Sequence, residues 1–246
     1  LGYGGVTKAA EFVARQAGAT FHTIAMPPLG SSGASYLDAV VAGLAEHSGS
    51  GVRLLVVDHI TSQTALVLPL AERLGFDPKR IAVGGDSAGG GLAVALTLLA
   101  QDQKEVAIAF QMPLYPMLDD RMATPSAADN DGPLWNSKSN EVSWRLYLGP
   151  LFRTDQVPVY AAPARCRDLT GLPPACTYVG SIEPFRDEVI DYFERLRAHG
   201  TDVHLNVFEG CFHGFDIVCA KTGIADAARD FLMSHFSYAT EHYFAA

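Results

Sequence analysis

The stretch AVGGDSAGGG, residues 82–91, decides the fold. It contains a single serine, Ser87, with one glycine two residues before it and another two residues after it. The apolar run 80–86 predicts a buried strand, and the run 89–102 predicts a helix. A serine between glycines at such a strand-to-helix turn is typical of a nucleophile elbow, G-x-S-x-G. We therefore expect the Ser87 side chain to project at the carboxyl end of the strand.

A nucleophile elbow requires a strained backbone at the serine and small residues around it. The turn holds its serine in a sparsely allowed conformation, which costs about 1–3 kcal/mol. The positions on either side crowd together, so both must be small, and here they are Gly85 and Gly89. The helix N-terminus behind Ser87 favours developing negative charge. The alternative is a turn that merely packs closely or cradles phosphate, and the absence of G-x-x-x-x-G-K-[ST] from the sequence disfavours the phosphate version.

Strand-like and helix-like segments alternate along the chain. The predicted strands are 19–25, 52–60, 80–86, 106–115, 173–180 and 202–208. The predicted helices are 35–47, 62–75, 89–102, 186–200 and 220–239. This order predicts an α/β fold with a mostly parallel sheet and helices on both faces. In such sheets, ligand sites lie at the carboxyl ends of the strands.

Composition narrows the class of protein. A chain of 246 residues fits one globular domain, and a net charge of −9 argues against nucleic acid and anionic membranes as partners. No apolar run reaches the length of a membrane-spanning helix. The N-terminus shows no signal-peptide pattern, and the four cysteines have no C-x-x-C spacing. We therefore expect a cytoplasmic protein with free thiols and no metal site.

A serine nucleophile needs a histidine base and an acid that orients it. In hydrolases of this architecture the order along the chain is serine, acid, histidine. His213, in EGCFHGFD, follows the predicted strand 202–208, whereas the other seven histidines lack such a setting. Glu183, in VGSIEPFRDE, follows the predicted strand 173–180. Asp187 remains the alternative acid, although its place in the first turn of a helix suits contact with the helix amides.

Four stretches then resemble a known family. GGDSAGGGLA, FQMPLYPMLDD, GLPPACTYVGSIEPFRDE and FEGCFHGFD are similar to the hormone-sensitive lipase-like branch of the α/β-hydrolase esterases, from about residue 73 to the end. The resemblance implies a serine carboxylesterase that hydrolyses short- to medium-chain acyl esters through an acyl-enzyme. Its triad would be Ser87, Glu183 and His213. The family usually has aspartate where this chain has Glu183, one methylene longer.

The first part of the chain departs from that family. The HGGG loop, whose amides help to bind the oxyanion, is absent from the sequence. Residues 1–72 instead resemble a fragment of a class V aminotransferase, through YGGVTKAAEFVARQAGA and VVDHITSQTALVLPLAE. The Schiff-base lysine of that family has no counterpart here, so we expect neither transaminase chemistry nor any cofactor. We interpret the chain as one hydrolase-like domain in which a fused segment, 1–72, completes the sheet.

The missing loop raises the question of what binds the oxyanion. The N–H of Ala88 is one expected donor, because it follows Ser87 at the helix start. We expect the second donor in the loop MPPLGSSG, 26–33. The candidate residues there are Gly30, Ser31, Ser32 and Gly33. The alternative is an ordinary connection in which Ser32 or Ser35 caps the next helix.

The polar segment 119–140 predicts an excursion above the carboxyl edge of the sheet. In the resembled family this region contributes to a cap, and we expect a partial cap over 119–152. The expected pocket residues are Trp135, Trp144, Phe212 and Phe215, although plain helix packing is an alternative for Trp144. We expect a small-molecule ester as partner and leave a homodimer open. A second hypothesis, favoured by the missing loop, is a catalytically impaired hydrolase or a non-catalytic ligand binder.

Overall fold

The computed structural model of the protein describes residues 14–15, 18–25, 33–47, 77–104 and 106–245. The chain divides into two compact units, Leu1–Phe76 and Asp77–Ala246. The boundary falls close to the junction expected from the sequence at residues 72 and 73.

In the first unit, the predicted helix 35–47 is confirmed as α2, Gly33–His47. The strand predicted at 19–25 is wrong, because these residues are described without strand structure. Aromatic and β-branched residues favour a strand only when a neighbouring strand supplies the hydrogen-bond ladder. Ile24 instead packs against α2 at Gly43, where an added Cβ would lie 2.7 Å from its Cγ1 atom. The predicted strand 52–60 and helix 62–75 lie outside the described residues.

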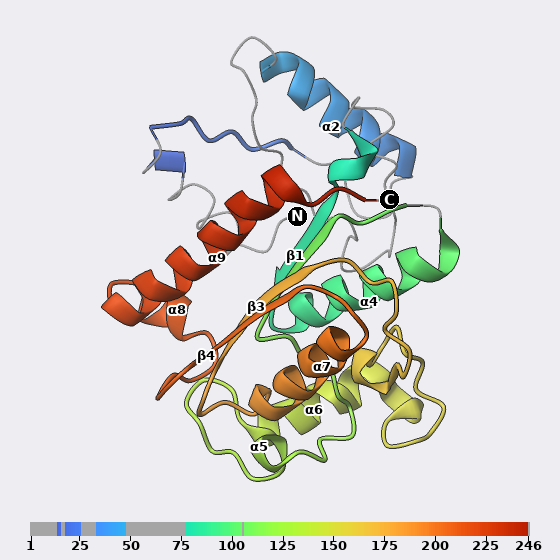
Figure 1. Ribbon diagram of the computed structural model, residues 1–246, viewed down its shortest axis with the longest axis vertical. Coiled ribbons are helices and arrows are strands. Elements are labelled where there is room, and N and C mark those ends of the chain that lie inside the picture. Colours follow the sequence, from blue (N-terminus) through green and yellow to red (C-terminus); the bar gives the residue numbers. More distant parts are fainter. Residues whose placement is uncertain (1–13, 16–17, 26–32, 48–76, 105, 246) are drawn as a thin grey trace. The chain divides into compact units, whose positions relative to one another are not determined.

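The second unit is built on a parallel sheet, as predicted (Figure 1). Its strands are β1 (Ala82–Asp86), β2 (Phe110–Leu114), β3 (Ala175–Gly180) and β4 (Val203–Phe208). They lie side by side in the order β1-β2-β3-β4. All carboxyl ends therefore meet at one edge, where the predicted site residues follow their strands.

The long helices of this unit cover both faces of the sheet (Figure 1). They are α4 (Ala88–Gln103), α7 (Arg186–Ala198) and α9 (Gly223–His242), each close to its predicted range. α4 and α7 lie on one side, and α9 lies on the other beside the short helix α8 (Phe215–Val218). α7 begins with acidic and ends with basic residues, which complements the helix dipole. No helix in the described residues has the length and apolar character needed to cross a bilayer.

The excursion between β2 and β3 contains short helices rather than a strand. Their bounds are α5 (Pro125–Ala128), α6 (Ser137–Leu148), η3 (Gly149–Leu151) and η4 (Pro163–Arg165); a further short helix, η2 (Pro78–Arg80), precedes β1. Ser126 ties the excursion to the start of α7, because its hydroxyl donates to the Pro184 carbonyl at 3.0 Å and its N–H donates to Asp187 at 2.8 Å.

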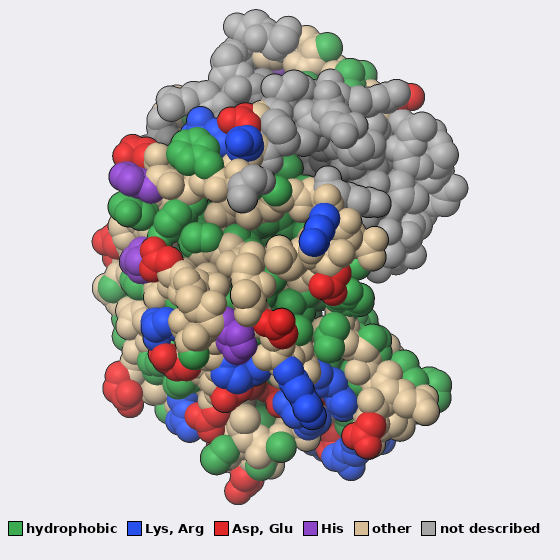
Figure 2. All heavy atoms as spheres, turned by 45° about the vertical axis from the view of Figure 1, so that its right-hand side comes forward, with side chains coloured by type: hydrophobic (Ala, Val, Ile, Leu, Met, Phe, Trp, Pro, Cys, Tyr) green, Lys and Arg blue, Asp and Glu red, His purple; other side chains and the backbone are tan. Residues whose placement is uncertain are grey.

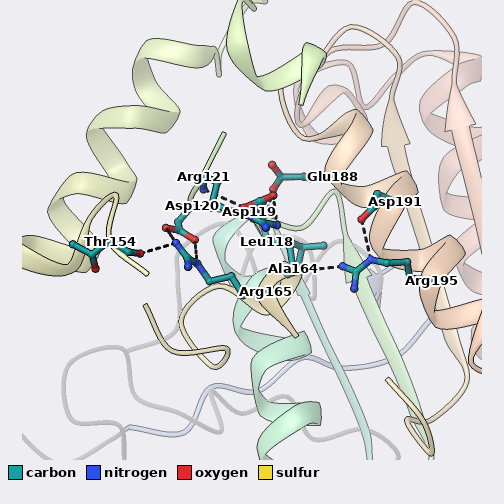
Figure 3. Close-up of polar contacts among 10 residues, drawn as sticks. All are labelled: Leu118, Asp119, Asp120, Arg121, Thr154, Ala164, Arg165, Glu188, Asp191 and Arg195. Carbon is teal, nitrogen blue, oxygen red and sulfur yellow. Dashed lines mark hydrogen bonds and ion pairs between the residues drawn. The ribbon is translucent and has the colours of Figure 1, made fainter. Parts of the chain in front are cut away.

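A buried carboxylate anchors the chain as it leaves β2 (Figure 3). Glu188, 2% exposed, accepts the N–H groups of Leu118 at 2.7 Å and Asp119 at 3.1 Å. Its Oε2 atom is buried and has no hydrogen-bond partner in the described structure. Burial raises the pKa of the Glu188 carboxyl well above its usual value. Next to it, Asp120 pairs with Arg165 at 2.6 Å and 2.8 Å. The contacts of Glu188 hold the start of the excursion against α7, and the Asp120–Arg165 pair joins it to η4.

Charges on the surface are mixed in sign. On the face in Figure 2, basic and acidic side chains are interspersed among the described residues. Glu141, for example, pairs with both Arg145 and Arg153 at 3.0 Å. Exposed pairs of this kind contribute at most about 1 kcal/mol to stability.

Candidate active site

Ser87 occupies a strained turn between β1 and α4. Its dihedral angles are φ 56° and ψ −120°, outside the regions that residues with a side chain normally adopt. The end of β2 holds this conformation in place. The Ser87 N–H donates to the Leu114 carbonyl at 3.0 Å, and the Ser87 carbonyl accepts from Gly91 and Met117. The turn therefore projects the Ser87 hydroxyl at the carboxyl edge of the sheet.

The two glycines of the motif are not equivalent. A Cβ added to Gly85 would lie 2.4 Å from the carbonyl oxygen of Gly89, which is too close for any side chain. A Cβ added to Gly89 would meet nothing within 4 Å in the described structure. The expected crowding is thus found at Gly85, and the turn needs glycine there because two backbones approach each other.

The loops after β3 and β4 are joined to each other. The Ser181 N–H donates to the Phe208 carbonyl at 3.0 Å, and the Ile182 N–H donates to the Cys211 carbonyl at 3.1 Å. A Cβ on Gly180 would lie 2.2 Å from the Cys211 oxygen, so this approach also depends on a glycine. The close contact brings the residues that follow β3 next to those that follow β4.

Three predicted residues meet at this edge. The His213 Nε2 atom lies 2.9 Å from Ser87 Oγ, and His213 Nδ1 lies 2.5 Å from Glu183 Oε2. Because a carboxylate only accepts, Nδ1 carries the proton, which leaves Nε2 to accept from the Ser87 hydroxyl. The other oxygen of Glu183 accepts the Gly180 N–H at 3.0 Å. Glu183 is 1% exposed and His213 is 6% exposed, so the pair is shielded from water.

The alternative acid, Asp187, lies elsewhere. Its Oδ1 atom accepts from Arg186 at 2.7 Å, and its Oδ2 atom accepts the Ser126 N–H at 2.8 Å. Burial opposes ionisation, but these hydrogen bonds outweigh it and lower the pKa of Asp187. The structure brings Glu183, and not Asp187, to the imidazole.

Aromatic rings surround His213. The ring of Tyr115 makes an edge contact at 4.8 Å between centroids, and Phe185 makes another at 5.1 Å. Trp135 lies at 6.1 Å. The sequence does not single out Tyr115 and Phe185, although both lie in stretches that resemble the esterase family, because an aromatic residue after a strand gives no signal of which ring it will contact. Tyr115 has a φ of 34°, a strained value that only the structure reveals.

The predicted pocket residues fall into two groups. Trp135 and Phe212 are partly buried, and Trp135 faces His213. Trp144 and Phe215 are each 1% exposed and belong to the hydrophobic core. The pocket role expected for these two stays a prediction. Trp144 lies on the core-facing side of α6, as the packing alternative expected. Phe215 packs against the rings of Tyr178 and Phe208.

Only some of the predicted oxyanion donors lie in the described residues. Ala88 is the first residue of α4, where its N–H has no partner within the helix. Gly30, Ser31 and Ser32 lie outside the described residues. Gly33 is the first residue of α2, in the first unit. The expectation for the 30–33 loop remains a prediction.

Several known proteins with similar sequences are named esterases. A model of the α/β-hydrolase fold family matches residues 38–217. The chain is 34% identical over 175 residues to the esterase LipI of Mycobacterium tuberculosis, covering 71% of this chain and 53% of that protein. It is 35% identical over 148 residues to the carboxylesterase NlhH of the same organism, covering 59% of this chain and 46% of that protein. The chain therefore spans about half the length of the curated relatives it matches.

Solved structures of esterases are also similar to this chain. A bacterial heroin esterase matches with a TM-score of 0.63 and 38% identity, over 81% of this chain and 58% of that one. Esterase LipW of Mycobacterium marinum matches with a TM-score of 0.62 and 30% identity, over 88% of this chain and 60% of that one. The family match begins at residue 38, so it includes part of the segment 1–72, for which we expected a resemblance to an aminotransferase. By this match and the elbow geometry, the chain belongs to the α/β-hydrolase fold family.

Proposed function

We propose that the protein is a serine carboxylesterase in which Ser87, His213 and Glu183 form the catalytic triad. The observation that carries the proposal is the continuous chain of contacts from Ser87 Oγ to His213 at 2.9 Å and from His213 to Glu183 at 2.5 Å. The esterase relatives support the reaction class. The strained backbone of Ser87 supports it too, because such strain accumulates at functional sites.

In the proposed first step, Ser87 Oγ attacks the carbonyl carbon of an ester. His213 Nε2 takes the hydroxyl proton as the new C–O bond forms, and the carbonyl oxygen becomes an oxyanion. The imidazolium then gives this proton to the leaving alkoxide oxygen as the ester C–O bond breaks. The products are an acyl-enzyme on Ser87 and a free alcohol.

In the second step, water is the nucleophile and Ser87 is the leaving group. His213 Nε2 takes a proton from water, the hydroxide attacks the acyl carbon, and the proton returns to Ser87 Oγ as the acyl–enzyme bond breaks. Glu183 stays ionised throughout and stabilises each imidazolium through Nδ1. The N–H of Ala88 is the proposed oxyanion donor in the described structure, and its position at the start of α4 adds the positive end of the helix dipole.

We propose short- to medium-chain acyl esters as the substrates. The aromatic contacts of His213 with Tyr115, Phe185 and Trp135 make this part of the site apolar. Hydrogen bonds pair Asn130 with Ser137 and join the Asn130 side chain to the Ile182 carbonyl, so they fix the loop that carries Trp135. In this proposal the loop belongs to a partial cap over 119–152.

The test is hydrolysis of a p-nitrophenyl ester with a short acyl chain. Ser87→Ala should abolish turnover. Ser234→Ala, an exposed serine on α9, is the matched control and should retain it. Turnover by Ser87→Ala at the rate of the unmodified protein would refute the assignment. The second candidate is a non-catalytic ligand binder, which predicts ester binding without turnover in both proteins.

A further inference from the structure

Beside His213 lies a carboxylate that the proposed mechanism does not use. Asp216 is the second residue of α8, three positions after His213. Its Oδ2 atom accepts hydrogen bonds from the hydroxyl groups of Tyr178 at 2.8 Å and Tyr115 at 3.4 Å. Its Oδ1 atom is buried and has no hydrogen-bond partner among the described residues.

The two tyrosines belong to the sheet. Tyr178 lies in β3, Tyr115 directly follows β2, and each is 1% exposed. Burial, reinforced by the charge of Asp216, raises the pKa of both hydroxyl groups. Both therefore remain protonated and act as donors. One carboxylate oxygen thus ties α8, and with it the loop that carries His213, to the ends of two strands.

Tyr115 extends this cluster to the imidazole. Its ring makes the edge contact with His213 at 4.8 Å and an interplanar angle of 72°. Its backbone is fixed as well, because its N–H donates to the Tyr178 carbonyl at 2.9 Å and the preceding carbonyl, that of Leu114, accepts the Ser87 N–H. The ring of Tyr115 therefore has little freedom once its hydroxyl is held. An imidazole packed against a fixed ring keeps Nδ1 directed at Glu183 and Nε2 directed at Ser87.

We propose that Asp216 is a positioning residue for His213, which it orients through the hydroxyl and ring of Tyr115. Its effect on turnover rests on the proposed esterase function, whereas its effect on the imidazole does not. Hydrogen bonds to a carboxylate are about twice as strong as those to a neutral acceptor. Asp216→Asn should therefore loosen Tyr115, and Tyr115→Phe should remove its contact with Asp216 while keeping the ring.

The kinetic test compares both variants with Asp226→Asn, an exposed carboxylate on α9 that serves as control. Asp216→Asn and Tyr115→Phe should each lower kcat about tenfold with KM nearly unchanged, because they disturb only the orientation of the base. The double variant should be no slower than the slower single one, since both changes break one contact. Unchanged kcat in folded Asp216→Asn, or fully additive losses, would overturn the proposal.

A spectroscopic test does not depend on turnover. The proton in the short hydrogen bond between His213 Nδ1 and Glu183 should give a far-downfield proton NMR signal, which His213→Gln identifies by removing it. Asp216→Asn and Tyr115→Phe should shift or broaden this signal, whereas Asp226→Asn should not. If the unmodified protein hydrolyses no ester, the proposed function falls and this signal alone decides the role of Asp216. A signal that neither variant moves would refute the role. If Asp216→Asn does not fold, Tyr115→Phe, which removes a single oxygen atom, carries the test.

Discussion

Glu183 Oε2 lies 2.5 Å from His213 Nδ1, although 30 residues separate the two along the chain. They meet because each follows one of two adjacent parallel strands, β3 and β4, and because hydrogen bonds join the loops after those strands. The glutamate holds the imidazole from the side opposite Ser87. In the proposed mechanism, this arrangement gives Glu183 the task of orienting and stabilising His213, which Asp187 does not contact.

Substitution of the two acids should have very different effects. Glu183→Gln should lower kcat by roughly 10³–10⁴, because the amide no longer fixes the Nδ1 tautomer or stabilises the imidazolium. Asp187→Asn should change kcat by less than about threefold and act mainly on stability, because its partners are Arg186 and Ser126. Steady-state kinetics on one ester, with thermal unfolding as control, measures both. A larger kinetic loss in Asp187→Asn would transfer the acid role to Asp187.

Alanine substitutions at the adjacent glycines Gly84 and Gly85 should have different effects on activity. Gly85→Ala would place a Cβ 2.4 Å from the Gly89 oxygen, so the turn must open and Ser87 must move. We expect activity to fall by at least about 10², since a misplacement of 1 Å at a catalytic group has costs of that size. Gly84→Ala is the matched control, because its Cβ would be 3.3 Å from the Met112 oxygen, which a small shift relieves. Similar activities for the two variants would show that the turn does not depend on Gly85.

The sequence is most informative for reactive side chains that directly follow predicted strands. The glycines and the flanking strand and helix point to Ser87, and their places after strands point to Glu183 and His213. Side chains that act only through packing carry no such signal. Trp144 and Phe215 look alike in the sequence whether they line a pocket or fill the core, and in the structure each is 1% exposed.

Other features depend on contacts between distant segments. The residues 19–25 have strand-like composition but no strand structure, because composition does not supply a pairing partner. Tyr115 and Asp216 lie 101 residues apart and meet only when β2 and α8 reach the same edge of the sheet. A single sequence cannot reveal such a pair.

Glu188 should make the free energy of unfolding decrease as the pH rises above about 4. Burial raises its folded-state pKa above the unfolded value of about 4.3, so the folded state binds more protons between these two values. The contribution of Glu188 to the free energy of unfolding is therefore largest below about pH 4, and it is lost as the pH rises through the folded-state pKa. Glu188→Gln keeps an oxygen for the Leu118 and Asp119 amides but cannot ionise. Urea unfolding at a series of pH values from about 4 upward should show a flatter profile for this variant, and parallel profiles would contradict the assignment.

His204 should produce the opposite dependence at acidic pH. Burial, and then the charge of the adjacent His235, whose ring centroid lies 4.2 Å away, lower the pKa of His204 in the folded state. The unfolded value is about 6.5, so the unfolded state binds more protons between the two values. The folded state should therefore lose stability as the pH falls below about 6.5. His204→Gln removes the titrating group from β4, and urea unfolding between neutral and mildly acidic pH should show a smaller decrease in the free energy of unfolding. His199→Gln, at the C-terminal end of α7, is the control and should retain the full decrease. If His204→Gln loses as much stability on acidification as the unmodified protein, His204 is not the source of the acid sensitivity.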